Sequence, residues 1–342
     1  RQSRMMMLAS RSWGRCGPTS RVSATRALAR TLCTPRQHTP THFRNTPNPH
    51  PLGVKKEWMN PTINHVWSDK ELDEVLSTQP RHQAQTIMEK VLSNGIQIAY
   101  WSFNKVTGYV ASDPTPGSIV TRLLLLESIA GVPGMVAAQH RHFYSLRAMS
   151  RDYGWIHSLL EEAENERMHL LTFIEAFEVQ GWQRWTIYLL QFGWAGFFIP
   201  LYVLSPRTAH RAVGYVEEMA VYTYCNIISL METPGTQLNT AWVDKEVPDI
   251  AKMYWRMEDT ATFTDLIKQI AADETNHRDV NHTFAEMAWT DPNPHVSQHL
   301  DDAAEASQWW RKKQGADMLE GKDLDYLMKN KPERATKPTT AT

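Results

Sequence analysis

Residues 165–170 read Asn-Glu-Arg-Met-His-Leu, and residues 273–278 read Asp-Glu-Thr-Asn-His-Arg. Each stretch contains a Glu followed three residues later by a His: Glu166 with His169, and Glu274 with His277. On an α-helix, residues three apart differ by about 60° in azimuth and about 4.5 Å in rise, so the two side chains converge on one point beside the helix. Each stretch therefore predicts a helix that offers one carboxylate and one imidazole to a shared partner.

Two further acids lie in apolar surroundings that are costly for a charge. Glu127 follows four consecutive leucines at 123–126, and Glu217 lies within Tyr-Val-Glu-Glu-Met-Ala. Burying a carboxylate is unfavourable unless it is protonated, paired or bound to a metal. One Glu from each of two helices, with Glu-x-x-His from each of two others, is the ligand set of di-iron carboxylate bundles. A single Glu-x-x-His often occurs by chance, and Asp279 with His282 fits a looser form of it, but two pairs in this order indicate a metal centre.

The residue types at this site restrict the metal. Carboxylates and imidazoles suit iron or manganese, and four carboxylates carry the charge that balances two divalent ions. The chain has three Cys, too few for a Cys-ligated zinc or iron–sulfur domain or for a disulfide scaffold. We expect two iron ions as the cofactor, although ligand chemistry alone leaves manganese open.

The helical pattern extends through the middle of the chain. Apolar residues recur with helical periodicity, and we find no run of alternating strands and no Gly-rich phosphate loop. The periodic segments are 81–93, 119–150, 154–179, 209–232 and 258–288, with a loop at 233–249. We therefore predict an all-α fold: a ferritin-like four-helix bundle with a di-iron centre, plus additional amphipathic helices for membrane attachment.

Composition divides the chain into four parts. Residues 1–50 contain nine Arg and no acid, with abundant Ser, Thr and Pro, which predicts a mitochondrial transit peptide. A basic disordered arm for RNA or lipid is the alternative, but the net charge of −1 argues against a nucleic-acid partner. We assign 51–118 to an N-terminal arm and first helix, 119–290 to the di-iron bundle, and 291–342 to a partly disordered C-terminal extension.

Two segments are apolar enough to interact with a membrane. Residues 185–206 are uncharged and rich in aromatic side chains, and 119–138 is interrupted only by Arg122 and Glu127. Both suit either transmembrane helices or helices that lie along one leaflet. If 185–206 crossed the bilayer, the ligand helices before and after it would lie on opposite sides and could not share a metal pair unless the site lay inside the bilayer. We therefore expect a monotopic protein whose segments 119–138 and 185–206 face one leaflet.

The residues around the four acids resemble a known family. The segments 126–135, 165–170, 216–220 and 273–282 are similar, in this order, to the sequence boxes of the alternative oxidases. The resemblance implies a cyanide-insensitive, non-proton-pumping terminal oxidase that oxidises ubiquinol and reduces O₂ to water. It also implies attachment to the matrix side of the mitochondrial inner membrane, usually as a homodimer. The implied iron ligands are Glu127, Glu166, His169, Glu217, Glu274 and His277.

The same resemblance implies roles for neighbouring residues. Tyr224 matches a redox tyrosine, although a core tyrosine with a satisfied hydroxyl is the alternative. The residues expected to hold the ligand histidines by hydrogen bonds are Asn165, Asp273 and Trp255. The positions expected to line the quinol site are Arg122, Leu126, Met219, Ala220 and Thr223.

Some of these positions leave alternatives or differ from the family pattern. Arg122 suits a contact to a quinone oxygen and equally a contact to lipid phosphate. Met219 replaces an acid that the family commonly has, and Gly131 replaces an Ala. His210 ends the apolar segment and is expected at the membrane or dimer boundary.

Other functions share parts of this pattern. A membrane-bound di-iron quinone hydroxylase would have similar Glu-x-x-His pairs but would insert oxygen into its substrate. A plastid-type quinol oxidase would differ mainly in its targeting segment. An iron-storage or structural bundle would need neither a membrane face nor Tyr224.

Overall fold

The computed structural model describes residues 64–177, 179, 181–296, 302, 304–306 and 308–309, all of which lie in the unit Met59–Thr342. These residues form helices and connecting loops with no β-strand, which confirms the all-α prediction. The predicted transit peptide, residues 1–50, lies outside the described residues. The helices are α2 (Asp69–Ser77), α3 (Ile87–Thr107), α4 (Pro116–Ala148), α5 (Trp155–Ala176), α6 (Gly181–Leu204), α7 (Pro206–Glu232), α8 (Gln237–Trp242), α9 (Asp249–Tyr254) and α10 (Phe263–Glu286).

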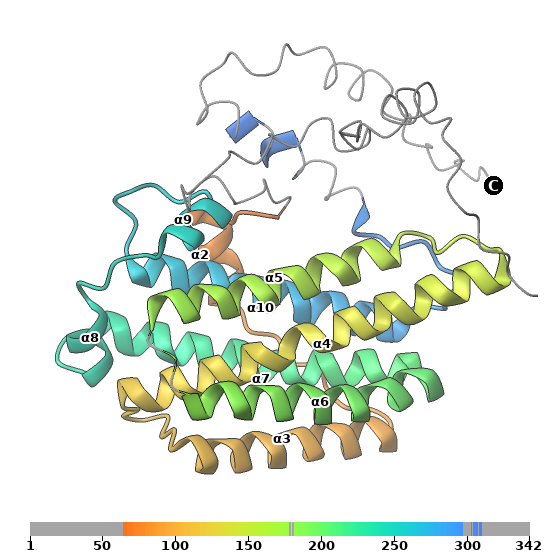
Figure 1. Cartoon of the computed structure of the whole chain (residues 1–342), viewed down its shortest axis with the longest axis horizontal. Helices are drawn as coiled ribbons and strands as arrows, with labels where there is room; N and C mark the ends of the chain where they lie inside the picture. Colours follow the sequence, from red (N-terminus) through yellow and green to blue (C-terminus); the bar gives the residue numbers. More distant parts are fainter. Residues whose placement is uncertain are drawn as a thin grey trace, which may run out of the picture. The chain divides into compact units, whose positions relative to one another are not determined.

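Four long helices, α4, α5, α7 and α10, form the predicted bundle. The closest pairs are α4 with α5 and α7 with α10 (Figure 1). Leu123 and Leu124 of α4 pack in one buried cluster with Ile227 of α7 and with Ile267 and Ile270 of α10. Each bundle helix therefore places one apolar stripe in a common core.

Local signals fix where these helices begin. The side chains of Thr115, Ser205 and Thr262 each accept a hydrogen bond from a backbone amide in the first turn of α4, α7 and α10. Pro116 and Pro206 occupy the first helical position, where a missing N–H costs nothing. These caps extend α4 and α7 by one turn beyond the predicted starts at 119 and 209.

Glycines allow α4 and α5 to approach closely. A Cβ on Gly134 would lie 2.6 Å from the backbone oxygen of Leu159, and a Cβ on Gly131 would lie 3.1 Å from that of Ala163. Contacts of this length leave no room for a side chain at Gly134. The two ligand-bearing helices are thus held at a separation that depends on the missing side chain.

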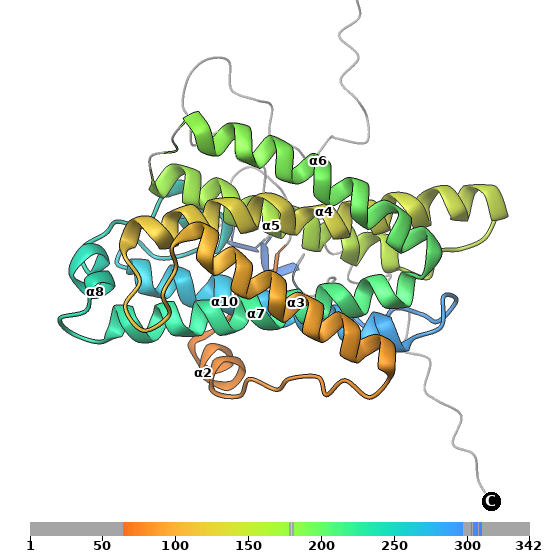
Figure 2. The ribbon, with the colours of Figure 1, turned by 90° about the horizontal axis from the view of Figure 1, so that it is seen from below.

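Helices α3 and α6 lie on the same side of the bundle, below it in Figure 1 and toward the viewer in Figure 2. Both expose large apolar side chains, including Ile98 and Trp101 of α3 and Leu189, Phe192 and Val203 of α6. By length and hydropathy, α4 and α6 could each cross a membrane, but half of the apolar window of α4 is buried and little of that of α6. Helices α3 and α6 therefore carry much of the exposed apolar surface, while residues such as Ile119 and Leu123 of α4 belong to the core.

Two sequence-based element boundaries were wrong. The short helix predicted at 81–93 is α3, which runs to Thr107 because Gly108 ends it in a left-handed conformation. The loop predicted at 233–249 contains the short helix α8, capped by Thr236. In α3 the apolar side chains face outward, so core periodicity did not reveal its length.

Candidate metal centre

The six predicted metal ligands meet in the centre of the bundle. Glu127 comes from α4, Glu166 and His169 from α5, Glu217 from α7, and Glu274 and His277 from α10; all six are buried. Their donor atoms form two groups in which every atom lies within 4.8 Å of the others. One group is Glu127, Glu166, His169 and Glu274, and the other is Glu166, Glu217, Glu274 and His277. Glu166 and Glu274 belong to both groups, so these two carboxylates would be shared by the two candidate sites.

Each histidine faces carboxylates from more than one helix. His169 Nδ1 lies 3.2 Å from Glu274 Oε1, 3.4 Å from Glu127 Oε2 and 3.5 Å from Glu166 Oε2. His277 Nδ1 lies 2.7 Å from Glu166 Oε1. The spacing of three residues in the sequence thus brings the paired Glu and His to one point, as helix geometry requires.

The charge of this cluster requires compensation. Burial and the neighbouring carboxylates raise the pKa of Glu127 to about 8 and the pKa of Glu217 well above its usual range. Burial also acts to raise the pKa of Glu166. The neighbouring His169 and His277 outweigh burial, so the pKa of Glu166 is lowered below its ordinary value. Several carboxylates can be ionised together here only if positive charge lies among them.

The donor atoms fit a pair of cations. Glu127 Oε2, both oxygens of Glu166, and Nδ1 of His169 and His277 are buried, and none makes a contact with hydrogen-bond geometry, although His277 Nδ1 lies 2.7 Å from Glu166 Oε1. Unsatisfied buried polar atoms are rare in folded proteins and often mark an ion or a water. An oxygen- and nitrogen-rich set of four carboxylates and two imidazoles is suited to iron or manganese.

Tyr224 of α7 contacts this cluster directly. Its hydroxyl donates a short hydrogen bond to Glu127 Oε1, and its side chain is buried. Burial and the charge of Glu127 raise the pKa of the Tyr224 phenol well above 10, so the phenol keeps its proton. The hydroxyl thus reaches a predicted ligand, and this hydrogen bond fits both the redox tyrosine and the alternative of a core tyrosine with a satisfied hydroxyl.

Asp273 contacts the Nε2 side of His169, opposite the Nδ1 that faces the carboxylates. Its Oδ2 lies 3.3 Å from His169 Nε2 and accepts hydrogen bonds from Asn165 Nδ2 at 3.0 Å and Trp255 Nε1 at 2.9 Å. Its Oδ1 accepts from Trp67 Nε1 at 2.7 Å. Of these four partners, Trp67 was missed by the sequence reasoning, because it lies in a loop segment 206 residues from Asp273. The network holds the Nδ1 side of His169 toward the carboxylates.

Comparison with known proteins agrees with this geometry. The family model described as alternative oxidase matches residues 67–286. The chain is 39% identical over 263 residues to "Alternative oxidase 2, mitochondrial" of Candida albicans, covering 72% of this chain and 67% of that protein. It is 38% identical over 284 residues to "Alternative oxidase, mitochondrial" of Aspergillus niger (78% and 77% covered), and 41% identical over 222 residues to the protein of that name from Trypanosoma brucei brucei (65% and 66%).

The chain belongs to the alternative oxidase family. Two of the residues that the alternative oxidase resemblance assigned to quinol, Arg122 of α4 and Thr223 of α7, are in contact. Arg122 is buried, and its guanidinium lies over the rings of Tyr100, Phe103 and Tyr109 at 4.7, 5.2 and 4.8 Å. Its Nη2 donates to Thr223 Oγ1 at 3.4 Å.

The Arg122 side chain is a buried cation without a carboxylate partner among the described residues. Its Nη1 donates to Asn104 Oδ1 at 2.5 Å, and its Nε has no partner. Burial lowers the pKa of this guanidinium but leaves it charged near neutral pH. Its burial under α3 argues against the alternative of contact with lipid phosphate. Leu126, Met219 and Ala220 are half-buried on α4 and α7 nearby in sequence.

His210 is buried in the bundle and does not lie at a membrane or dimer boundary. Its ring is buried, with Nε2 3.2 Å from the Tyr202 hydroxyl and Nδ1 2.9 Å from Asn281 Oδ1. The expectation of a boundary position was therefore wrong, because the start of α7 turns this side chain into the bundle rather than outward.

Proposed function

We propose that this chain is a mitochondrial ubiquinol oxidase that transfers electrons from ubiquinol to O₂, forms water and pumps no protons. The observation that carries the proposal is the convergence of four buried carboxylates and two imidazoles, with Tyr224 hydrogen-bonded to one of them. The relatives named mitochondrial alternative oxidases support the assignment to mitochondria.

We assign the cofactor as two iron ions held by Glu127, Glu166, His169, Glu217, Glu274 and His277. When bound, iron would supply the redox chemistry that carboxylate and imidazole side chains lack. Metal analysis of the purified protein tests the assignment: two irons per chain are expected in wild type, and manganese at that ratio would contradict it.

The protein side chains have separate tasks in this proposal. Asp273, with Asn165 and Trp255, orients His169. Tyr224 holds a proton at its Oη, one hydrogen bond from Glu127, where an electron and a proton can leave together. Arg122 offers its unpartnered Nε–H to a quinol oxygen, and the Thr223 hydroxyl, which donates to the Met219 backbone oxygen, offers its oxygen as an acceptor for a quinol O–H. Leu126, Met219 and Ala220 offer apolar contacts to the ring. Met219 provides no carboxylate at its position, so the polar contacts to quinol come from Arg122 and Thr223.

We place the membrane contact on α3 and α6, at the matrix face of the inner membrane. The exposed apolar side chains of these helices form one side of the bundle, and a helix pair lying in one leaflet keeps all four ligand helices on the same side. This assignment keeps the expected segment 185–206 and replaces 119–138 by α3, because α4 is a core helix.

We also propose a homodimer through α4 and α5. Met135, His142 and Leu146 recur at intervals of seven and four along the exposed side of α4, and Leu160 of α5 is exposed as well. Light scattering of the detergent-solubilised protein should give twice the chain mass, and Leu146→Glu should give a monomer. A wild-type monomer would contradict the dimer.

Oxygen uptake tests the function. Membrane-reconstituted, iron-loaded protein should consume O₂ with ubiquinol in the presence of cyanide, form water, and lose this activity in Glu274→Ala. No uptake by iron-loaded wild type would exclude the oxidase. Incorporation of ¹⁸O from ¹⁸O₂ into the quinone would instead support the hydroxylase.

A further inference from the structure

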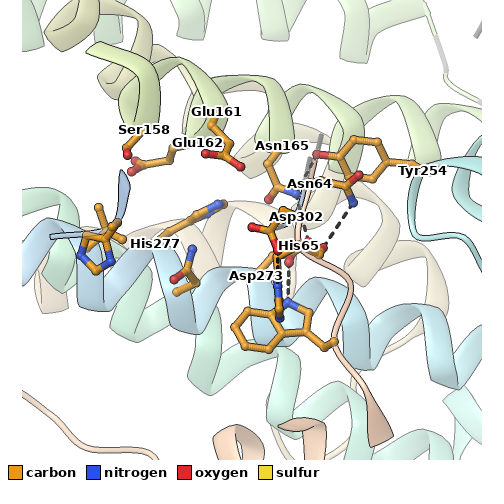
Figure 3. A pocket seen from close by; sticks show the side chains of 14 residues that line it. Asn64, His65, Ser158, Glu161, Glu162, Asn165, Tyr254, Asp273, His277 and Asp302 are labelled. Carbon is orange, nitrogen blue, oxygen red and sulfur yellow. Dashed lines mark hydrogen bonds and ion pairs between the residues drawn. The ribbon is translucent and has the colours of Figure 1, made fainter. Parts of the chain in front are cut away.

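A polar cavity lies beside the metal ligands, between α5, α10 and the loop segment that carries His65 and Trp67 (Figure 3). Its volume is about 70 Å³. His277, a predicted ligand, and Asp273, which holds His169, both line it. One layer of side chains therefore separates the cavity from the metal centre.

Several buried polar atoms of the residues that line the cavity lack hydrogen-bond partners, and two of them are Asn165 Oδ1 and His295 Nε2. Asn165 uses its Nδ2 group on Tyr254 and Asp273, each at 3.0 Å, and its buried Oδ1 has no donor. The buried Nε2 of His295 also has no partner. Buried polar atoms are satisfied in nearly all folded proteins, by protein or by water. A water needs roughly 10–15 Å³ of such volume, so the cavity has room for several waters at these atoms.

The remaining lining is acidic and reaches the surface. Glu162 is buried, and both of its carboxylate oxygens accept from Asn281 Nδ2 at 3.0 Å. Burial raises the pKa of Glu161 and of Glu162 to about 7. Glu161 and Ser158 are partly exposed, so the outer end of the cavity is accessible to solvent. This polar lining contrasts with the apolar side chains of α3 and α6 on the other side of the bundle.

We propose that this cavity is a water-filled port between the metal centre and the aqueous phase, through which protons reach the centre and product water leaves. The proposal rests on the proposed oxidase function for its chemistry. Reduction of one O₂ to two waters takes up four electrons and four protons, and oxidation of two quinols releases the same numbers. The electrons come from the quinol at the apolar side, and the port connects the proton-consuming site to bulk water. Substrate and product thus use opposite sides of the bundle.

The first test measures water in the cavity without using activity. Pulsed X-ray radiolysis in H₂¹⁸O labels side chains that lie next to bound water. Tyr254 lines the cavity and Tyr202 does not, although both are buried. We expect at least several-fold more ¹⁸O on Tyr254 than on Tyr202. Equal label on the two tyrosines would overturn the proposal.

The second test closes the cavity. Ser158 lines it and accepts a hydrogen bond from Asn293 Nδ2 at 2.7 Å. Ser158→Leu and Ser158→Ala both lose that bond, but only Leu fills the cavity. We expect Ser158→Leu to lower the Tyr254 label and to reduce ubiquinol-dependent O₂ uptake roughly tenfold, with iron content and the KM for quinol unchanged. Ser158→Ala should keep both the label and the rate.

The outcomes separate this proposal from the proposed function. Equal rates for Ser158→Leu and Ser158→Ala, with the label lost only in Ser158→Leu, would overturn the port. Wild type that carries the Tyr254 label but shows no ubiquinol-dependent uptake would overturn the oxidase function instead.

Discussion

Several hydrogen-bond donors beside the metal centre converge on Asp273. A carboxylate can accept from Trp67, Trp255 and Asn165 and still face His169, whereas an amide presents one oxygen and one NH₂ group. We expect Asp273→Asn to weaken iron binding about 10- to 100-fold, measured as iron loss to a chelator. Asp259→Asn, at an exposed carboxylate, is the control. Unchanged iron retention in Asp273→Asn would show that the network does not orient His169.

A substitution at Tyr224 tests electron transfer separately from metal binding. Tyr224→Phe keeps the buried ring and removes the hydroxyl that donates to Glu127. Since the phenol is not among the six predicted ligands, iron content should stay at the wild-type value, while O₂ uptake with ubiquinol falls roughly 100-fold. A variant that retains full uptake would assign Tyr224 to packing alone.

His210 makes stability depend on pH. Burial lowers the pKa of His210 to about 4, from the ordinary 6.5. Between these values the unfolded chain binds a proton that the folded protein excludes, so this residue favours unfolding as pH falls from 6.5 to 4, by about 1.4 kcal/mol per pH unit, and adds no further effect below 4. Thermal unfolding in detergent should show a steeper loss of Tm over this window in wild type than in His210→Gln. Parallel profiles would contradict the low pKa.

At the scale of the element, the contact between α4 and α5 is the most restrictive. An added methyl on Gly134 would meet a backbone oxygen, so the helices must separate. We expect Gly134→Ala to destabilise the protein by about 1–3 kcal/mol and to lower iron content, because Glu127 and Glu166 lie on these two helices. Gly117→Ala, in the same helix with no atom within 4 Å of the added Cβ, should not destabilise it. Gly131→Ala should have a smaller effect than Gly134→Ala.

Some features of the helices can be predicted from residues close together in the sequence. Glu166 with His169, and Glu274 with His277, are separated by less than one helical turn, so spacing alone predicted that each pair converges. The cap residues Thr115 and Ser205 are equally local.

Contacts between residues far apart in the sequence could not be predicted from local spacing. Trp67 reaches Asp273 across 206 residues, and no periodicity marks it. Helix α3 covers Arg122, but its outward apolar face does not follow the pattern of a core helix. Contacts of this kind depend on the tertiary fold, which a single sequence does not display.

In the part of the chain that the structure describes, α3 and α6 form an apolar side. Val203 of α6 and Val243, in the loop after α8, are exposed to nearly the same degree, 57% and 58%. We expect Val203→Lys to lower binding to liposomes of inner-membrane composition roughly tenfold, because a charge would enter the hydrocarbon boundary. Val243→Lys should bind like wild type. Equal binding by both variants would place the membrane contact elsewhere.

The bond between Trp67 and Asp273 also has a consequence for biogenesis. A ribosome makes Trp67 long before Asp273, and α10 is the last of the four ligand helices to be synthesised. Until α10 docks, two of the six predicted ligands and the carboxylate that orients His169 are missing. On the proposed metal assignment, the complete ligand set becomes available only after α10 has emerged and docked. A chain truncated before α10 lacks Asp273, Glu274 and His277 and could not form this site.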